Sequence, residues 1–257
     1  MKSPLKNKWI LITGASSGFG AAMARLLAAQ GCHLALGARR LDRVQGLADE
    51  LAQAHGVQTF AGAVDTRDTA SVNAFVEAAA AALGGLHVLV ANAGLASGTY
   101  KLWETPDEDL EAMMRTNIEG VVKTVRAGLP HLRKAGWGHV FFIGSVAGHQ
   151  PYEGGSVYCA SKMGLRAMAH SLRLELNGEQ IRVTELDPGM AETEFSNVRL
   201  KDDAKAKSVY QGVTPLRAED VAECVRWCLA LPDHVNIDEL LVKCVDQAAP
   251  HKLHRRV

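Results

Sequence analysis

Trp9-Ile10-Leu11-Ile12-Thr13-Gly14-Ala15-Ser16-Ser17-Gly18-Phe19-Gly20 is the stretch that predicts the fold of this chain. A short apolar run leads directly into three glycines, and residues 21–30 then read as a helix that stops at Gly31. Gly14 permits a tight turn, Gly18 lets backbone N–H groups approach a pyrophosphate, and Gly20 allows close helix packing. The stretch therefore predicts a dinucleotide-binding unit, with an ordinary strand-to-helix turn as the alternative.

The end of the second predicted strand indicates which dinucleotide is bound. The strand Cys32–Gly37 runs into Ala38, Arg39 and Arg40, about twenty residues after the glycines. An acidic residue at this place would bind the ribose 2′-OH of NAD, whereas arginine accommodates the 2′-phosphate of NADP. We therefore predict NADP. The alternative is that Arg39 and Arg40 are surface charges that begin the next helix.

Strands and helices alternate along the rest of the chain, which predicts a parallel sheet with helices on both faces. The fold class is α/β, with one Rossmann domain over residues 1–257 and a doubly wound sheet of seven strands. Residues 190–212 lack strong periodicity and are expected to form a short helix and loop over the site, as a lid. Pro130 is expected to bend or end a long helix that starts at Asp107. The remaining predicted strands are Gln58–Val64, Leu86–Val90, His139–Ile143, Ile181–Leu186 and Leu240–Val242.

Tyr158 and Lys162 are the first candidates for chemistry. Residues four apart on a helix lie on one face, one turn from each other. An ammonium group beside a phenol favours the phenolate, so Lys162 is expected to lower the Tyr158 pKa. A tyrosine tuned in this way can exchange a proton with a substrate oxygen. A solvated helix face is the alternative, because this spacing also arises by chance.

Composition excludes several other classes of protein. The formal net charge is zero, so neither nucleic acid nor an anionic membrane is an expected partner. Five cysteines occur without a C-x-x-C pair, which predicts a reducing, cytoplasmic location and no metal site. The N-terminal segment Met1–Lys8 has no apolar signal region. The basic tail His251–Arg256 is expected to be solvated or to contact another subunit.

Several motifs fall in one order along the chain and resemble the short-chain dehydrogenase/reductase family over essentially its whole length. They are Thr13–Gly20, Asn92-Ala93-Gly94, Asn117, Ser145, Tyr158-x-x-x-Lys162 and Pro188-Gly189. The resemblance implies a homotetramer. It also implies an oxidoreductase with a catalytic Ser-Tyr-Lys-Asn tetrad. Ala91, where the family often has asparagine, and Phe19, where isoleucine is usual, depart from the pattern without removing a group that the chemistry needs.

The resemblance assigns a role to each tetrad member. Tyr158 would be the general acid in reduction and the base in oxidation, and Lys162 would lower its pKa and bind the nicotinamide ribose. Ser145 would hold the substrate oxygen. Asn117 would fix a water that joins Lys162 to bulk solvent. The expected cofactor-binding residues are Gly14, Ser16, Ser17, Gly18, Phe19, Gly20, Arg39, Arg40, Asp65, Thr66, Asn92, Ala93, Gly94, Tyr158, Lys162, Pro188, Gly189 and Thr193.

The C-terminal third is similar to the NADP-dependent 3-hydroxy acid dehydrogenases within this family. Thr193–Arg199 and Leu231–Ile237 carry this similarity. It implies a small hydroxy acid as substrate. Gln150 and Glu153 depart from the subgroup on the substrate side, and we include Gln150, Ser145 and Arg199 as candidate substrate residues.

We expect Arg199 to bind a substrate carboxylate, because guanidinium and carboxylate match in a two-pronged geometry. A structural ion pair with Glu192, Glu194 or Asp202 is the alternative. A broad carbonyl reductase is the alternative function. A dinucleotide-sensing protein without catalysis is the alternative of a different class, since a fold alone does not give a function.

Overall fold

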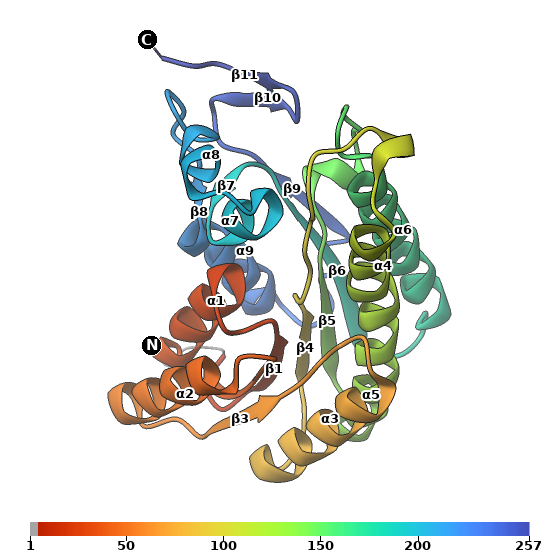
Figure 1. Ribbon diagram of the computed structural model, residues 1–257. Coiled ribbons are helices and arrows are strands. Elements are labelled where there is room, and N and C mark those ends of the chain that lie inside the picture. Colours follow the sequence, from red (N-terminus) through yellow and green to blue (C-terminus); the bar gives the residue numbers. More distant parts are fainter. Residues whose placement is uncertain (1–4, 257) are drawn as a thin grey trace.

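Seven parallel strands form the centre of the computed structural model, which describes residues 5–256 (Figure 1). The order across the sheet is β3-β2-β1-β4-β5-β6-β9, and every neighbouring pair is parallel. The predicted fold class and strand number are confirmed. Residues 1–4 of the predicted N-terminal segment lie outside the described residues. The strands are β1 (Trp9–Thr13), β2 (His33–Ala38), β3 (Thr59–Ala63), β4 (Val88–Ala91), β5 (Gly138–Ile143), β6 (Ile181–Pro188) and β9 (Glu239–Val242).

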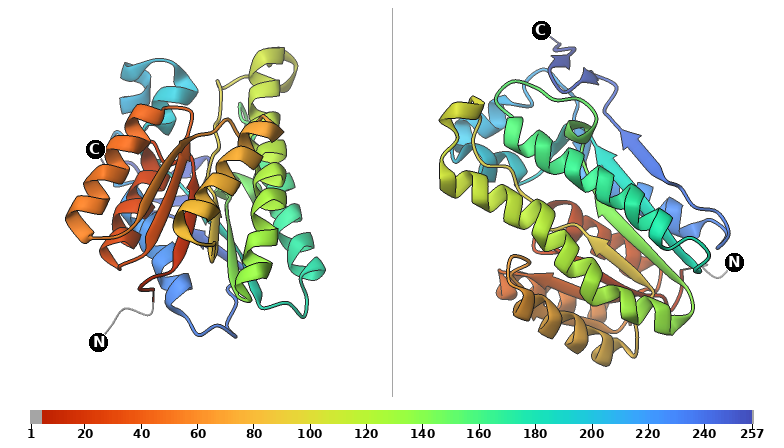
Figure 2. Two further views of the ribbon diagram at one scale, coloured as in Figure 1. Left: turned by 90° about the horizontal axis from the view of Figure 1, so that it is seen from below. Right: turned by 90° about the vertical axis from the view of Figure 1, so that its right-hand side faces the viewer.

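Helices cover both faces of the sheet (Figure 2). On one face α1 packs against both α2 and α9, and α3, α5 and α6 cover the other face. Successive side chains of a strand point to opposite faces, so Ile10 and Ile12 enter one core while Leu11 enters the other. The helices are α1 (Gly18–Ala29), α2 (Leu41–His55), α3 (Thr69–Leu83), α4 (Asp107–Met114), α5 (Gly120–Ala135), α6 (Ser156–Glu175) and α9 (Ala218–Ala230).

The long helix that begins at Asp107 differs from the prediction. A π-helical turn, η2 (Arg115–Glu119), separates α4 from α5. Pro130 lies inside α5 and does not end it, because the helix continues to Ala135. The missing proline N–H costs a helix one hydrogen bond, which the surrounding turns of this amphipathic helix tolerate.

Residues 190–212 form two short helices and one strand, α7 (Phe195–Leu200), α8 (Asp203–Ser208) and β7 (Ala191–Glu192). β7 pairs with β8 (Leu216–Arg217). Figure 1 shows α7 and α8 on the same side of the molecule as the hairpin β10 (Gln247–Ala249) and β11 (Lys252–Leu253).

The basic tail contacts its own chain. Arg255 donates to the backbone oxygens of Gln211 and Val209, and Arg256 forms an ion pair with Asp246 at 2.8 Å.

All five cysteines have free thiols. Among residues 5–256, no helix combines the length and the apolar content that a membrane span requires.

Candidate active site

The glycine-rich turn packs tightly against the end of β4. Gly14 has a φ of 69°, and a Cβ at this position would lie 2.9 Å from the Ala93 Cα atom. The Asn92 side chain donates to the Thr13 and Gly14 carbonyl oxygens at 2.8 and 3.2 Å. Any larger residue at position 14 would therefore displace backbone. The turn is held at the switch point of the sheet, between β1 and β4, where ligands of this fold bind.

A cavity of about 520 Å³ opens at this switch point. It brings together most of the predicted cofactor residues. Gly20 does not line it, because this glycine faces the turn: a Cβ there would lie 2.5 Å from the Gly14 carbonyl oxygen. Pro188 and Gly189 line a second cavity instead. The predicted residues in the first cavity are Gly14, Ser16, Ser17, Gly18, Phe19, Arg39, Arg40, Asp65, Thr66, Asn92, Ala93, Gly94, Tyr158, Lys162 and Thr193.

One corner of this cavity is suited to a phosphate group. Arg40 donates to the hydroxyl oxygens of Ser16 and Ser17 at 3.0 and 2.8 Å. Its guanidinium also pairs with Glu194 at 3.1 Å, and Arg43 pairs with the same carboxylate at 2.9 Å. Guanidinium groups and hydroxyl donors are the groups that bind a phosphate monoester, so these residues fit a 2′-phosphate. Arg43 was not predicted, although it lies three residues after Arg40.

Asp65 is paired within its own loop. Arg67 holds it in a two-pronged ion pair with a shortest distance of 2.6 Å. This hydrogen bonding lowers the Asp65 pKa to about 2, although partial burial acts in the opposite direction. Arg67 also lines the cavity and was not predicted.

Tyr158 and Lys162 both lie on α6, as predicted, and both side chains are buried, which excludes the alternative of a solvated helix face. The expected lowering of the Tyr158 pKa by Lys162 is wrong for this structure. Burial raises the Tyr158 pKa well above its usual value, and Ser145 and Arg199 are the groups that oppose the shift. The Lys162 ammonium lies 5.9 Å from the centre of the Tyr158 ring and donates to the Ile143 carbonyl oxygen at 2.7 Å.

Burial also lowers the Lys162 pKa to about 8, against the opposing charges of Asp187 and Glu185. Desolvation favours the neutral form of either group, so it moves the pKa of a phenol up and that of an amine down. These shifts reverse the order of the two groups: in water the phenol is the stronger acid by a small margin, whereas in this structure the Lys162 ammonium is the stronger acid.

Asn117 sits in the π-helical turn and holds two segments together. Its amide accepts from the Leu95 N–H at 2.9 Å, donates to the Leu95 carbonyl at 2.8 Å, and donates to the Ser161 hydroxyl at 3.0 Å. Ser161 in turn donates to the Tyr158 carbonyl oxygen at 2.7 Å. Gly94 lies close by: a Cβ there would come within 3.3 Å of the Asn117 oxygen and 3.6 Å of the Lys162 nitrogen. Single π-turns are frequent at functional sites.

Ser145 follows β5, and its backbone is held by the side chain of Asp187 on β6. Its backbone N–H donates to Asp187 at 2.9 Å, and its hydroxyl accepts from the Ala147 N–H at 3.1 Å. Asp187 and Glu185 are both fully buried on β6. Burial raises the pKa of both, to about 8 for Glu185. None of these acidic groups was singled out from the sequence.

A second cavity of about 280 Å³ joins Ser145, Tyr158 and Arg199. Arg199 donates to the Tyr152 hydroxyl at 2.9 Å and to the Gly98 carbonyl at 3.1 Å, and its guanidinium carbon lies 5.9 Å from the centre of the Tyr158 ring. The predicted alternative, an ion pair with Glu192, Glu194 or Asp202, is not formed among residues 5–256.

Gln150 and Tyr152 lie in the same loop, but only Tyr152 lines a cavity. Gln150 is exposed and does not line either of these two cavities. Tyr152, two residues further on, lines the second cavity and was not assigned a role from the sequence. Its signal was present, because it is an aromatic residue between Pro151 and two glycines in a loop that follows a candidate catalytic serine.

The strand order, the glycine-rich turn at the switch point and the facing Ser145 and Tyr158 define a dinucleotide-dependent dehydrogenase. Comparison with known proteins agrees: residues 8–204 match the model of the short chain dehydrogenase family. The chain belongs to this family, which confirms the resemblance seen in the sequence.

Individual relatives span nearly the whole chain. The NADP-dependent 3-hydroxy acid dehydrogenase YdfG of Escherichia coli is 40% identical over 250 residues, which cover 96% of this chain and 99% of that protein. Sulfoacetaldehyde reductase 2 of Chromohalobacter salexigens is 42% identical over 241 residues, covering 93% of this chain and 95% of that protein. The closed form of serine dehydrogenase complexed with NADP⁺ superimposes with a TM-score of 0.90 at 40% identity, covering 96% of this chain and all of the other.

Proposed function

We propose that this chain is an NADP(H)-dependent dehydrogenase that interconverts a small hydroxy acid, of the 3-hydroxy acid or serine type, with its carbonyl form. The names of the relatives support the cofactor and the substrate class. The observation that carries the proposal is Arg199, whose guanidinium lies in the same cavity as Ser145 and Tyr158.

The proposed chemistry divides between the cofactor and the chain. The nicotinamide ring, when bound, supplies or accepts the hydride. Tyr158 passes a proton to the carbonyl oxygen in reduction and takes it from the hydroxyl in oxidation, and Ser145 holds that oxygen. Lys162 assists as a buried cation on the same helix face. Asn117 positions the loop at Leu95 and, through Ser161, the turn of α6 that carries Tyr158.

Arg199 supplies the preference for an acid. A guanidinium has five N–H donors, and the contacts of Arg199 with Gly98, Tyr152 and Gly154 leave some of them available. The guanidinium carbon also lies 5.4 Å from the centre of the Tyr152 ring and 5.9 Å from that of the Tyr158 ring, so cation–π attraction helps to hold it in place. A planar, positioned guanidinium beside the reacting groups is suited to a carboxylate at one end of a short substrate.

The test compares an acid with a neutral analogue. The formation of NADPH from NADP⁺, or of NADH from NAD⁺, is followed by absorbance. The substrates are L-serine, 3-hydroxypropionate, 3-hydroxyisobutyrate and a panel of neutral secondary alcohols. Activity on the acids with NADP⁺, and little on the neutral alcohols, supports the proposal. Arg199→Ala should raise the KM of the acid by roughly 10- to 100-fold, the loss of one charge-assisted hydrogen-bonded contact. It should leave that of a neutral alcohol nearly unchanged.

Two controls separate a binding role for Arg199 from a structural one. Arg199→Lys retains the charge without the planar fork and should recover only part of the acid KM. Thermal unfolding of each variant reports any loss of the contacts with Gly98 and Gly154. Equal losses on acid and neutral substrates, with a lowered Tm, would make Arg199 a structural residue.

A sulfonate in place of the carboxylate is a second candidate, because a sulfoacetaldehyde reductase is among the similar proteins. Sulfoacetaldehyde therefore belongs in the panel. Activity only on neutral ketones would favour a broad carbonyl reductase. Tight NADP⁺ binding with no turnover on any substrate would favour a dinucleotide sensor.

The organisation of the whole protein follows the same proposal. Residues 190–212 act as a lid, since Thr193 and Phe195 line both cavities.

A cytoplasmic homotetramer is expected, with α5 and α6 in one interface. Val122 on α5 and Met163 on α6 are exposed apolar side chains suited to that contact. Sedimentation of the purified chain measures the oligomeric state.

A further inference from the structure

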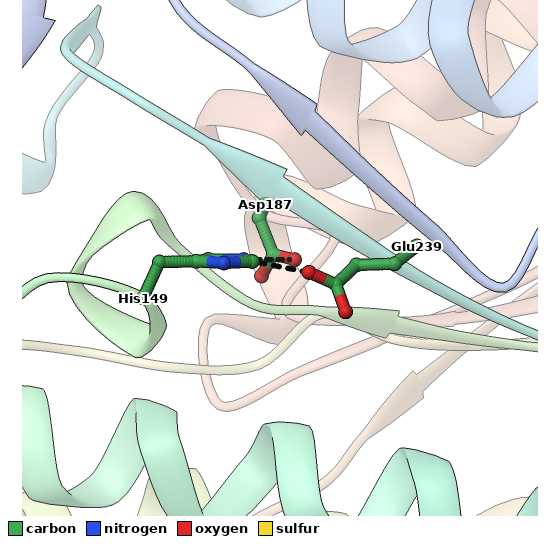
Figure 3. Close-up of side chains that lie close together, drawn as sticks. All are labelled: His149, Asp187 and Glu239. Carbon is green, nitrogen blue, oxygen red and sulfur yellow. Dashed lines mark hydrogen bonds and ion pairs between the residues drawn. The ribbon is translucent and has the colours of Figure 1, made fainter.

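A cluster of histidine and carboxylate groups lies behind the candidate active site, where β6 and β9 run side by side (Figure 3). The His149 Nε2 atom is 3.0 Å from an Asp187 oxygen and 3.1 Å from a Glu239 oxygen. His149 comes from the loop after Ser145, Asp187 from β6 and Glu239 from the edge strand β9. One ligand atom from each of the three lies within 4.8 Å of the other two.

Glu185 is the second observation that points to a ligand. It is fully buried, and neither of its carboxylate oxygens has a hydrogen-bond partner among residues 5–256. It faces the cluster, because it pairs in register with Glu239 and its oxygen lies within 4.8 Å of ligand atoms of Glu239 and His170. A buried carboxylate without a partner is costly, so the site is complete only with a further proton or cation.

Carboxyl groups outnumber the basic side chains around the cluster. Arg166 reaches Glu239 with two donors at 3.1 Å, and the Lys162 amine lies near Asp187 and Glu185. Asp187 and Glu185 are fully buried, so their carboxyl groups need a proton or a cation as a partner. A divalent cation would serve several of these carboxyl groups at once.

We propose that His149, Asp187 and Glu239 bind a divalent transition-metal ion, with Glu185 as a further oxygen ligand. Mixed imidazole and carboxylate ligands suit Zn²⁺ and its neighbours, whereas Mg²⁺ and Ca²⁺ favour oxygen ligands alone. Ligands about 2.0–2.1 Å from a tetrahedral ion are about 3.3 Å apart, close to the two spacings around His149. His170 and Arg166 are partly exposed, which gives an ion a route from solvent.

The ion would join three segments that the fold brings together. Asp187 faces His149 with one carboxylate oxygen and accepts the Ser145 N–H with the other. A metal bound to Asp187 would therefore be separated from the backbone of the candidate catalytic serine by a single carboxylate. The ion would fix the loop after Ser145 to the edge strand of the sheet. Binding does not depend on the proposed dehydrogenase activity, so it is measured directly.

The experiment titrates the chelator-treated full-length chain with ZnCl₂ near neutral pH by calorimetry and follows thermal unfolding. One Zn²⁺ per chain is expected, and a hundred-fold excess over Kd should raise Tm by about 5–10 °C. Mg²⁺ should have no such effect. Glu239→Gln and His149→Ala should each weaken Zn²⁺ binding by about 100-fold, since even outer-shell partners are worth roughly 10- to 100-fold.

His131→Ala is the matched control. His131 and Glu77 form another histidine–carboxylate pair at 3.1 Å, far from the cluster on α5 and α3, and Zn²⁺ binding should be unchanged in this variant. No stoichiometric binding, or equal binding in the parent, Glu239→Gln and His149→Ala, would overturn the proposal. If Glu239→Gln does not fold, Co²⁺ is bound instead to the parent and to His149→Gln, and their visible absorption spectra are compared. Loss of the His149 ligand should change the spectrum, so identical spectra would refute the site.

Discussion

Glu194 should weaken the binding of NADP⁺ by competing for Arg40. Its carboxylate pairs with Arg40 at 3.1 Å and with Arg43 at 2.9 Å, beside the two serines that we assign to the 2′-phosphate. A phosphate at this corner would share Arg40 with a carboxylate of like charge. Glu194→Gln removes that charge while it retains the shape of the side chain, so NADP⁺ should bind more tightly.

The magnitude follows from the exposure of these groups. The three side chains are 43–48% exposed, so each ion pair is worth about 0.2–1 kcal/mol. Freeing Arg40 should therefore tighten NADP⁺ binding by roughly 0.5–1 kcal/mol, which corresponds to about 2- to 5-fold in Kd. NAD⁺ lacks the 2′-phosphate, so its Kd should change little. The gain should shrink as salt is raised, because exposed charges are screened.

Calorimetric titration of the two cofactors into parent and variant measures this effect. Glu192→Gln is the control, because it removes the same charge from an exposed side chain two residues away. A Kd for NADP⁺ that stays constant or rises in Glu194→Gln would refute the reasoning, and so would an equal gain for NAD⁺ or an equal gain in the control. A rise would mean that Glu194 holds Arg40 in its binding position.

Three further changes have defined outcomes. Tyr158→Phe should lower kcat by roughly 10²- to 10⁴-fold with an unchanged Kd for NADP⁺, measured by steady-state kinetics and titration. Gly14→Ala should abolish NADP⁺ binding and lower Tm, because its Cβ would lie 2.9 Å from backbone at a φ of 69°. Asp65 has a folded-state pKa of about 2, so its ion pair with Arg67 stabilises the protein above the unfolded value of 3.8 and loses that effect as pH falls toward 2. Asp65→Asn should therefore cost under about 1 kcal/mol near neutral pH, and the difference in Tm from the parent should vanish near pH 2.

The fold and the groups at strand ends were predictable because local patterns carry them. The glycine-rich turn specifies its own backbone, and strands that alternate with helices leave few possible topologies. The spacing of Tyr158 and Lys162 likewise fixes them on one helix face. Each of these features is determined by residues close together in the chain, so it can be predicted from one sequence without knowledge of distant contacts.

The partners of individual side chains were less predictable, because they come from distant segments. Arg199 contacts Gly98 and Tyr152, 101 and 47 residues away, and not the nearby acids that its sequence offered. Burial sets the direction of the Tyr158 pKa shift and Ser145 opposes it, so the lysine one turn away did not predict that direction. Alternation along β6 places Glu185 and Asp187 on one face, but only the fold shows that this face is closed to water.

The π-helical turn at Arg115–Glu119 also sets the angular relation between α4 and α5. Each residue of an α-helix advances about 100° around its axis, so one extra residue in a turn rotates everything beyond it by that amount. Deleting one residue from this turn would restore a regular helix, but it would point α5 away from the sheet or swing Asp109 and Met113 of α4 out of their buried positions. The π-turn therefore sets the rotation between the buried face of α4 and that of α5, and alignments or redesigns of this segment must conserve its number of residues.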